Sequence, residues 1–527
     1  MRSPALNRTL LFSAPLLLAL PPLHAAAEAK DAIKERAIIY LEDGETINQT
    51  LRTLKSNPNK KARRQELIKK LKERSATSQP SILKWLEENG ATEVHPLWAT
   101  NAIIFEADGE TILAAAALDS VSRITLDINI PLDRGLPIPA GEPVYAEWNL
   151  SRINADLLWA RGIKGNQITV ALVDSGADPL HPDVSSKYLG GENAWFDPHG
   201  EHATPSDVDG HGTNILGLIL GGEESGTAIG TAPESSWIAA KIYDDNGNGT
   251  LADIMRSYDW LLDPDGDPLT DDMPDVINNS WGFTTDIGFC LRDLEPYLDL
   301  FASADIAMVF AAGNFGPGTW SSVSPANNSN AISVGASTEE DTVATFSSRG
   351  PNPCSEDIFP DLTAPGAWNV FTSDLTLGGT NPYPYVYVWG TSAAAAHLSG
   401  GVALILSAWP ERSIAEIEAA LKETAVDIYT TGPDDASGYG LIDLYAAYLS
   451  LAPADCMDED NDGYFVGGTK CHIEDCDDSA ATIYPGALDI PGDGIDQDCS
   501  GSDSEKPASS SGGGGGGCFI EALSSNL

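Results

Sequence analysis

The chain has 527 residues, more than one hydrophobic core usually serves, so several domains are expected. Its 77 acidic and 30 basic residues give a formal net charge of -47. Nucleic acids and anionic membranes need a basic surface, so this balance argues against both as partners and favours cation binding.

The N-terminus has the layout of a secretory signal, which we place at residues 1–27. Arg2 and Arg8 precede the apolar run LLFSAPLLLALPPL, and the small residues HAAAEA follow it. The run is too short and too interrupted by proline to span a membrane. The sequence therefore predicts a secreted protein without a membrane span, extracellular or at the cell surface, with a periplasm only as a place of transit.

Residues 28–135 differ from the rest in charge and pattern. Before Gly135 lie 18 of the 30 basic residues but only 17 of the 77 acidic ones. Strand-like RAIIYLE, NAIIFEA and VSRITLD alternate with helical text, namely the Lys-rich stretch through QELIKKLKERS and SILKWLEENG, and TILAAAALD. This pattern predicts a small α+β domain with two helices on an antiparallel sheet. The proline-containing segment 136–148 follows as an exposed linker open to proteolysis.

Residues 149–452 contain short apolar runs that alternate with helices. The runs are QITVALVD, SSWIAAKIYD, DVINNSW, DIAMVFAAGN and NAISVGAS. Continuous apolar strands of this kind indicate a mostly parallel sheet covered on both faces, a doubly wound α/β domain. In such a domain the chemistry lies at the carboxyl ends of the strands.

Three short boxes supply the residue types of a nucleophilic triad. VALVDSGAD, DGHGTNILG and WGTSAAAAHLSG carry Asp174, His211 and Ser392 in that order. A serine hydroxyl becomes a strong nucleophile when an imidazole takes its proton. The imidazole in turn needs a buried carboxylate that holds its tautomer. The boxes therefore predict a hydrolase in which Ser392 attacks the substrate.

These boxes and their surroundings resemble the subtilisin-like serine peptidases over nearly all of residues 145–450. The resemblance implies that Asn314, at the end of AAGN, is an oxyanion-hole donor. It implies that an extended substrate pairs with the chain near VINNSWG and neighbouring loops, through Ser280, Trp281, Gly282, Gly247, Gly249, Ala312 and Gly313. The N-terminal α+β domain resembles the inhibitory propeptide of that family, so the linker would contain the maturation site.

The sequence departs from the family pattern at a few positions. Asn214 stands where the family usually has a second histidine, which affects local hydrogen bonding rather than the triad. Ala393 and Ala396 replace the usual Met and Pro after the nucleophile. The resulting prediction is a self-processed serine endopeptidase acting on proteins or peptides, with its own propeptide as intramolecular inhibitor. The alternative is a catalytically silent, calcium-binding surface scaffold on the same fold.

Residues 455–503 are rich in Asp and Gly and poor in apolar residues. Four of the seven cysteines lie here, Cys456, Cys471, Cys476 and Cys499, and predict two disulfides with three open connectivities. DCMDEDNDGYF has the alternate carboxylates and glycine of a calcium loop, and resembles thrombospondin type 3 repeats. The predicted structural Ca²⁺ ligands are Asp458, Asp460, Asp462, Tyr464, Asp475, Asp477, Asp493, Asp496 and Asp498, although a disordered acidic linker has a similar composition.

Weaker predictions concern two loops and the tail. DPDGDP could hold calcium through Asp263, Asp265 and Asp267, and Asp183 matches a position that binds calcium in many relatives. Residues 504–527 form a Ser/Gly linker and tail in which Cys518 marks either cell-surface attachment or a simple thiol.

Overall fold

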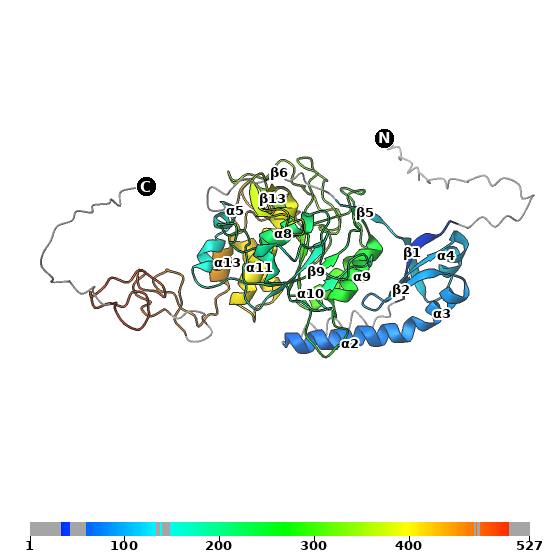
Figure 1. Ribbon diagram of the computed structural model, residues 1–527, viewed down its shortest axis with the longest axis horizontal. Coiled ribbons are helices and arrows are strands. Elements are labelled where there is room, and N and C mark those ends of the chain that lie inside the picture. Colours follow the sequence, from blue (N-terminus) through cyan, green and yellow to red (C-terminus); the bar gives the residue numbers. More distant parts are fainter. Residues whose placement is uncertain are drawn as a thin grey trace, which may run out of the picture.

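The computed structural model describes residues 33–42, 59–132, 138–139, 148–467, 471 and 475–504. An N-terminal domain, a central domain and an acidic C-terminal segment follow one another along the molecule (Figure 1). The predicted signal, most of the linker, and the tail with Cys518 lie outside the described residues.

The N-terminal domain is the predicted α+β unit. Its elements are β1 (Glu35–Leu41), α2 (Lys60–Ser78), α3 (Pro80–Glu88), β2 (Thr92–Leu97), β3 (Ala102–Ala107), α4 (Gly109–Ala115) and β4 (Val121–Leu126). The strands form an antiparallel sheet in the order β2-β3-β1-β4. The helical stretch breaks at Pro80, because proline is compatible with the first turn of a new helix but not with a helix interior.

Alternate residues of β1 belong to two different cores. Ala37, Ile39 and Leu41 pack with Ile82 of α3, inside the N-terminal domain. Ile38 and Tyr40 point the other way and share a core with α9 and α10 of the central domain. Since successive strand residues face opposite sides, the sheet joins the two domains by its second face.

The central domain is doubly wound, as predicted. Its first half contains α5 (Trp148–Arg152), α6 (Ala155–Trp159), β7 (Thr169–Asp174), α7 (Pro182–Ser185), β8 (Trp195–Phe196), α8 (His211–Leu220), β9 (Ser236–Lys241), β10 (Asn248–Thr250) and α9 (Leu251–Leu261). The second half contains β11 (Val276–Asn279), α10 (Glu295–Ser303), β12 (Ala307–Ala311), β13 (Ile332–Ser337), β14 (Leu362–Pro365), β15 (Val370–Ser373), β16 (Tyr385–Val388), α11 (Thr391–Ala408), α12 (Ile414–Thr424) and α13 (Leu444–Ser450).

Seven parallel strands form the central sheet in the order β14-β13-β12-β11-β7-β9-β8. Val170 and Leu172 of β7 pack with α8 and α11 on one face, whereas Ala171 and Val173 pack with α9 and α10 on the other. Strand order reverses at β7, which has β9 on one side and β11 on the other. The carboxyl end of β7 is therefore the switch point where such folds bind ligands.

Helix α11 is the buried centre of the domain. It is long and apolar enough to cross a membrane by length and composition, but 89% of that window is buried inside the protein. Its run of alanines explains how, because small side chains let it lie close to β11, β12 and β13. Ala393 and Ala396 are both buried in this packing.

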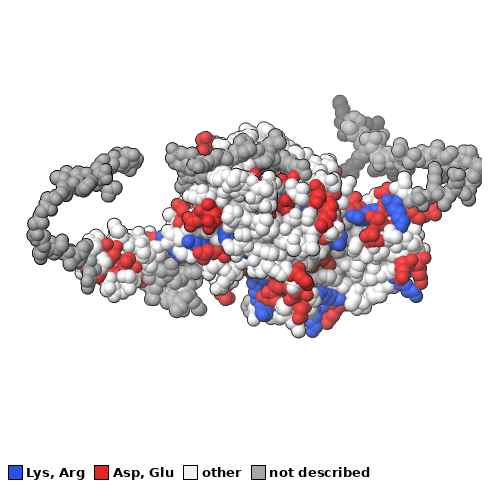
Figure 2. Space-filling view, in the orientation of Figure 1, with Lys and Arg blue, Asp and Glu red and all other residues white. Residues whose placement is uncertain are grey.

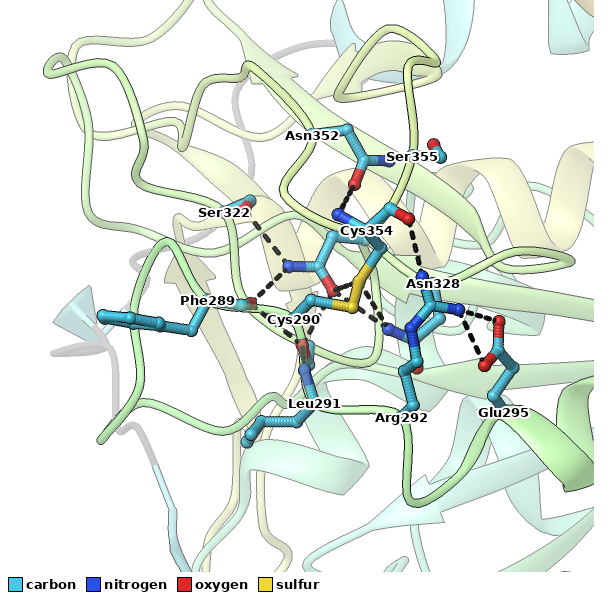
Figure 3. The surroundings of a disulfide bond; sticks show 12 residues. Phe289, Cys290, Leu291, Arg292, Glu295, Ser322, Asn328, Asn352, Cys354 and Ser355 are labelled. Atoms are coloured by element: carbon cyan, nitrogen blue, oxygen red, sulfur yellow. Dashed lines mark hydrogen bonds and ion pairs between the residues drawn. A yellow bond between two sulfur atoms is a disulfide. The ribbon is translucent and has the colours of Figure 1, made fainter. Parts of the chain in front are cut away.

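Three disulfides join described cysteines. Cys456–Cys471 and Cys476–Cys499 select one of the three pairings left open by the sequence. The third, Cys290–Cys354, links two loops 64 residues apart, with Arg292 donating to the Cys354 carbonyl at 2.7 Å (Figure 3). Closing a loop of this length stabilises the folded state by about 4 kcal/mol in the chain-entropy account.

Candidate active site and metal centre

Asp174 and His211 form a hydrogen-bonded pair at the switch point. Asp174 is the last residue of β7 and is 1% exposed, and its Oδ1 accepts a hydrogen bond from His211 Nδ1 at 2.7 Å. The Ser175 amide donates to the same oxygen at 2.7 Å. Because Nδ1 carries the proton, Nε2 of a neutral His211 is left as the basic nitrogen.

His211 is positioned by the start of α8. Asp207 accepts hydrogen bonds from the Gly210 and Thr213 amides, both at 2.9 Å, and so caps this helix. A Cβ on Gly212 would lie 2.0 Å from the Gly176 carbonyl, so only glycine lets α8 approach the end of β7 this closely. Asn214, which replaces the family's second histidine, donates to the Ser373 carbonyl at 2.7 Å and is fully accommodated.

Ser392 lies in the first turn of α11, beside the end of β11. Its Oγ donates to the Ser280 carbonyl at 3.2 Å, and Ser280 Oγ donates back to the Ser392 carbonyl at 3.2 Å. Asn278 and Ser399 extend this buried network by bonds of 2.9 Å each. Within the described ranges no hydrogen bond joins His211 to Ser392, so Ser392 must change its χ1 rotamer to reach the imidazole.

Asn314 follows β12 and is oriented by the nucleophile's own helix. Its Oδ1 accepts from the Thr391 amide at 2.9 Å and from the Thr391 hydroxyl at 3.0 Å. A Cβ on Gly390 would lie 3.5 Å from Asn314 Nδ2 and 3.7 Å from the Ser392 amide. Both donors therefore face the space above Gly390, where a substrate oxyanion would be stabilised by them and by the positive end of α11.

The pKa of His211 is raised to about 9. Burial lowers this pKa, but the Asp174 carboxylate, helped by Asp209 and Asp207, outweighs burial by stabilising the imidazolium. A general base must be neutral, so we expect kcat/KM to rise about tenfold per pH unit up to that pKa and then level off. A pH profile of the processed enzyme on a peptide substrate measures this, and a plateau already reached at pH 7 would contradict it.

Removing the Asn314 side chain tests the oxyanion assignment. Asn314→Ala is expected to lower kcat about 10² to 10³-fold with little change in KM, since the bond forms only in the transition state; subtilisin is the worked case for this loss. Steady-state kinetics measure it, with Asn328→Ala as a distant control. An unchanged kcat would show that Asn314 does not act on the oxyanion.

The predicted groove residues behave unequally. Gly249 pairs with Ile130 and the Gly247 carbonyl accepts from the Leu132 amide at 3.3 Å, so both contact the N-terminal chain. Trp281 is only 5% exposed and packs on Phe310, so its side chain does not line a groove. The remaining predicted residues are walls around Val323 or support β12: Gly282, Ala312 and Gly313.

Two clusters of carboxylates are brought together in the C-terminal segment. Ligand atoms of Asp458, Asp460 and Asp478 lie within 4.8 Å of one another, as do those of Asp460, Asp462 and Asp475. One oxygen of each carboxylate accepts a backbone amide, so the loop holds the side chains in place. The other oxygens of Asp458, Asp460, Asp462 and Asp475 are buried without a partner.

This chemistry fits a hard divalent cation. Burial, together with the neighbouring carboxylates, raises the pKa values of Asp462 and Asp475. Unpartnered buried carboxylate oxygens are costly unless a cation binds them. Asp478 was missed by the sequence analysis because it follows the predicted runs by one residue and breaks their alternate spacing.

The other predicted ligands are not gathered in the described residues. Asp477, Asp493, Asp496 and Asp498 accept amides of nearby turns, and Tyr464 stacks on Tyr484. Asp263 and Asp265 do meet, together with Asp272, whereas Asp267 accepts the Leu269 amide instead.

Asp183 is a structural carboxylate rather than a calcium ligand. Its Oδ1 accepts from the Glu224 amide at 2.8 Å and its Oδ2 from Tyr385 Oη at 2.6 Å. The Lys187 ammonium donates to the Asp183 carbonyl at 2.9 Å. The expected cation position beside it is therefore filled by a side chain of the same protein.

The acidic segment is attached to the central domain through Arg161. Its guanidinium lies 4.5 Å from the Tyr445 ring and 4.7 Å from the Tyr464 ring, and its Nη2 donates to the Asp462 carbonyl at 2.6 Å. Phe465 is 4% exposed and contacts Trp409 at the end of α11. The calcium-type loop and the α/β domain therefore share a packed interface.

The doubly wound sheet, the buried carboxylate–imidazole pair and the serine at a helix start are typical of a hydrolase that uses an Asp-His-Ser triad. Comparisons with known proteins give the family. The model of the Subtilase family matches residues 165–440, and a second model, described as "Putative metal-binding motif", matches residues 475–505. The chain belongs to the subtilase family.

Individual relatives agree with this assignment. Bacillopeptidase F of Bacillus subtilis (strain 168) is 31% identical over 429 residues, covering 74% of this chain and 29% of that protein. Serine protease AprX of the same organism is 33% identical, covering 49% of this chain and 61% of that protein. Subtilisin of Bacillus pumilus is 34% identical over 302 residues, 57% of this chain and 98% of that protein. The chain thus spans less than a third of bacillopeptidase F.

Proposed function

We propose that this protein is a secreted serine endopeptidase that is made as a precursor and processes itself. The observation that carries the proposal is the Asp174–His211 pair, 2.7 Å apart at the carboxyl end of β7, with Ser392 and Asn314 on the same side of the sheet. Membership of the subtilase family supports it.

The chain's residues would act in a defined order. Ser392 Oγ attacks the carbonyl carbon of the scissile peptide bond while His211 Nε2 takes the hydroxyl proton. Asn314 Nδ2 and the Ser392 amide stabilise the oxyanion, and Asp174 stabilises the imidazolium. His211 then gives its proton to the leaving amine, and an acyl-enzyme forms. Water, activated by the same imidazole, releases the acid and restores Ser392.

The N-terminal domain is proposed to inhibit the enzyme by acting as a bound substrate. Strand β5 (Asn129–Pro131) pairs antiparallel with β10, with Ile130 opposite Gly249. Ile130 is fully buried in the core that α9 and α10 build. An extended chain added to a strand edge is how peptides are commonly bound. Cleavage would fall in the linker that follows, which the sequence places at 136–148.

We further propose that the cation bound in the C-terminal segment is Ca²⁺. Carboxylates and backbone oxygens at short spacing are the ligands that calcium prefers. The matching metal-binding motif supports a metal in this segment. Three disulfides among the described cysteines are in keeping with export to an oxidising compartment, extracellular or on the cell surface.

One experiment separates this function from a silent calcium-binding scaffold. Wild type and Ser392→Ala are expressed as full chains, labelled with a fluorophosphonate, and followed for release of the N-terminal domain. Wild type should take the label and shorten, whereas Ser392→Ala should do neither. Absence of label from wild type, with equal processing of both proteins, would favour the scaffold.

A further inference from the structure

Helix α2 of the N-terminal domain lies along the acidic underside of the central domain. Lys60 pairs with Asp275 at 3.1 Å, Arg63 with Asp305 at 3.3 Å, and Arg64 with Asp271 at 3.2 Å. Basic and acidic side chains gather where this helix meets the central domain (Figures 1 and 2). The N-terminal domain therefore neutralises a surface that its departure would leave unpaired.

One of these contacts has the composition of a metal site. Ligand atoms of Asp263, Asp265 and Asp272 lie within 4.8 Å of one another in the loop between α9 and β11. The loop closes on itself, because the Asp265 amide donates to Asp272 Oδ2 at 2.8 Å. The Asp263 side chain is 1% exposed, and both Asp263 Oδ1 and Asp272 Oδ1 are buried without a partner among the described residues.

The cluster already holds a cation, which is the Lys72 ammonium. Lys72 Nζ pairs with Asp263 Oδ2 and also donates to the Gly266 carbonyl at 2.9 Å. A carboxylate and a backbone carbonyl are the oxygen donors that a hard cation uses. One ammonium cannot balance three carboxylates, and burial together with the neighbouring carboxylates raises the pKa of Asp272 to about 6.

We propose that Asp263, Asp265, Asp272 and the Gly266 carbonyl form a Ca²⁺ site that the Lys72 ammonium fills in the precursor and that the ion fills after the N-terminal domain leaves. This proposal rests on the proposed maturation. Its physical reason is that removal of Lys72 leaves the buried Asp263 carboxylate uncompensated, at a cost of several kcal/mol. Ion and ammonium compete for the same oxygens. Each must therefore weaken binding of the other, and calcium favours release of the N-terminal domain.

The test uses the full chain with Ser392→Ala, so that no processing is needed. Calcium is titrated by calorimetry, and Tb³⁺ by luminescence excited through Trp98, whose ring centre lies 5.2 Å from Lys72 Nζ. Adding Lys72→Ala should create one more ion site per chain than in the Ser392→Ala parent. Adding Asp263→Asn to that double variant should remove the site again.

Matched controls keep the outcome clear. Lys72→Arg keeps the positive charge and should bind no extra ion. Lys84→Ala removes an exposed lysine of the same domain, one that pairs only with Glu88 in α3, and should also bind none. Equal ion numbers in Lys72→Ala and its parent would overturn the proposal. Because every variant carries Ser392→Ala, this result does not depend on whether the protein is a peptidase.

Discussion

Asp174→Asn is expected to slow self-cleavage of the precursor about 10⁴-fold, the loss seen when the same carboxylate is neutralised in another serine peptidase. An amide keeps the size of the side chain but cannot stabilise the imidazolium. It can also present its NH₂ to His211 Nδ1, which would place the proton on the wrong nitrogen. The half-life of the full chain, followed by gel, measures the effect.

The pH dependence of self-cleavage gives this prediction a second readout. Asp174 is the main partner that raises the pKa of His211. Without its charge, burial dominates and the pKa falls, so the reduced rate should level off at lower pH than in wild type. Asp286→Asn, an exposed change on the central domain, should leave both rate and profile as in wild type. Equal rates in Asp174→Asn and wild type would exclude Asp174 from the triad.

Removing divalent cations is expected to detach the acidic segment and lower the stability of the chain. A site occupied at 100 times its dissociation constant stabilises the folded protein by about 2.7 kcal/mol. The segment itself has few apolar residues, and its carboxylates repel one another when no cation binds them. Thermal unfolding of the Ser392→Ala chain in calcium and in chelator measures the difference.

Asp475→Asn makes this second prediction specific. Asp475 is 2% exposed and has a buried oxygen without a partner, so the variant should lose most of the calcium-dependent stabilisation. Exposed Glu411→Gln on the central domain changes the same charge and should keep it. Cleavage by an added protease after α13 should become faster in the same variant. A full calcium response in Asp475→Asn would show that the ion binds elsewhere.

The parts of the fold that sequence could predict are local. Apolar runs such as that ending in Asp174 gave the parallel strands, because buried strands show their burial as continuous hydrophobicity. The triad boxes were visible because each lies at a strand end or a helix start. Edge strand β2 was missed, since its sequence TEVHPL is polar, half exposed and contains a proline.

Contacts between distant segments could not be predicted in this way. Lys72 and Asp263 are 191 residues apart, and neither sequence pattern indicates the other. Trp281 was placed in the groove by its neighbours in sequence, but the packing of Phe283 and Phe310 around it decides that it faces the core. The pairing of the cysteines likewise depends on where loops meet, which single-sequence reasoning does not provide.

Helix α11 has a different use at each of its ends. Ser392 lies in its first turn, and Trp409, which contacts Phe465 of the acidic segment, follows its last. Eighteen residues at 1.5 Å each make this helix about 27 Å long. The helix is thus a rigid spacer between the nucleophile and the attachment point of the C-terminal segment. Whatever holds the protein by that segment leaves the nucleophile a fixed distance away and free to meet a bulky substrate.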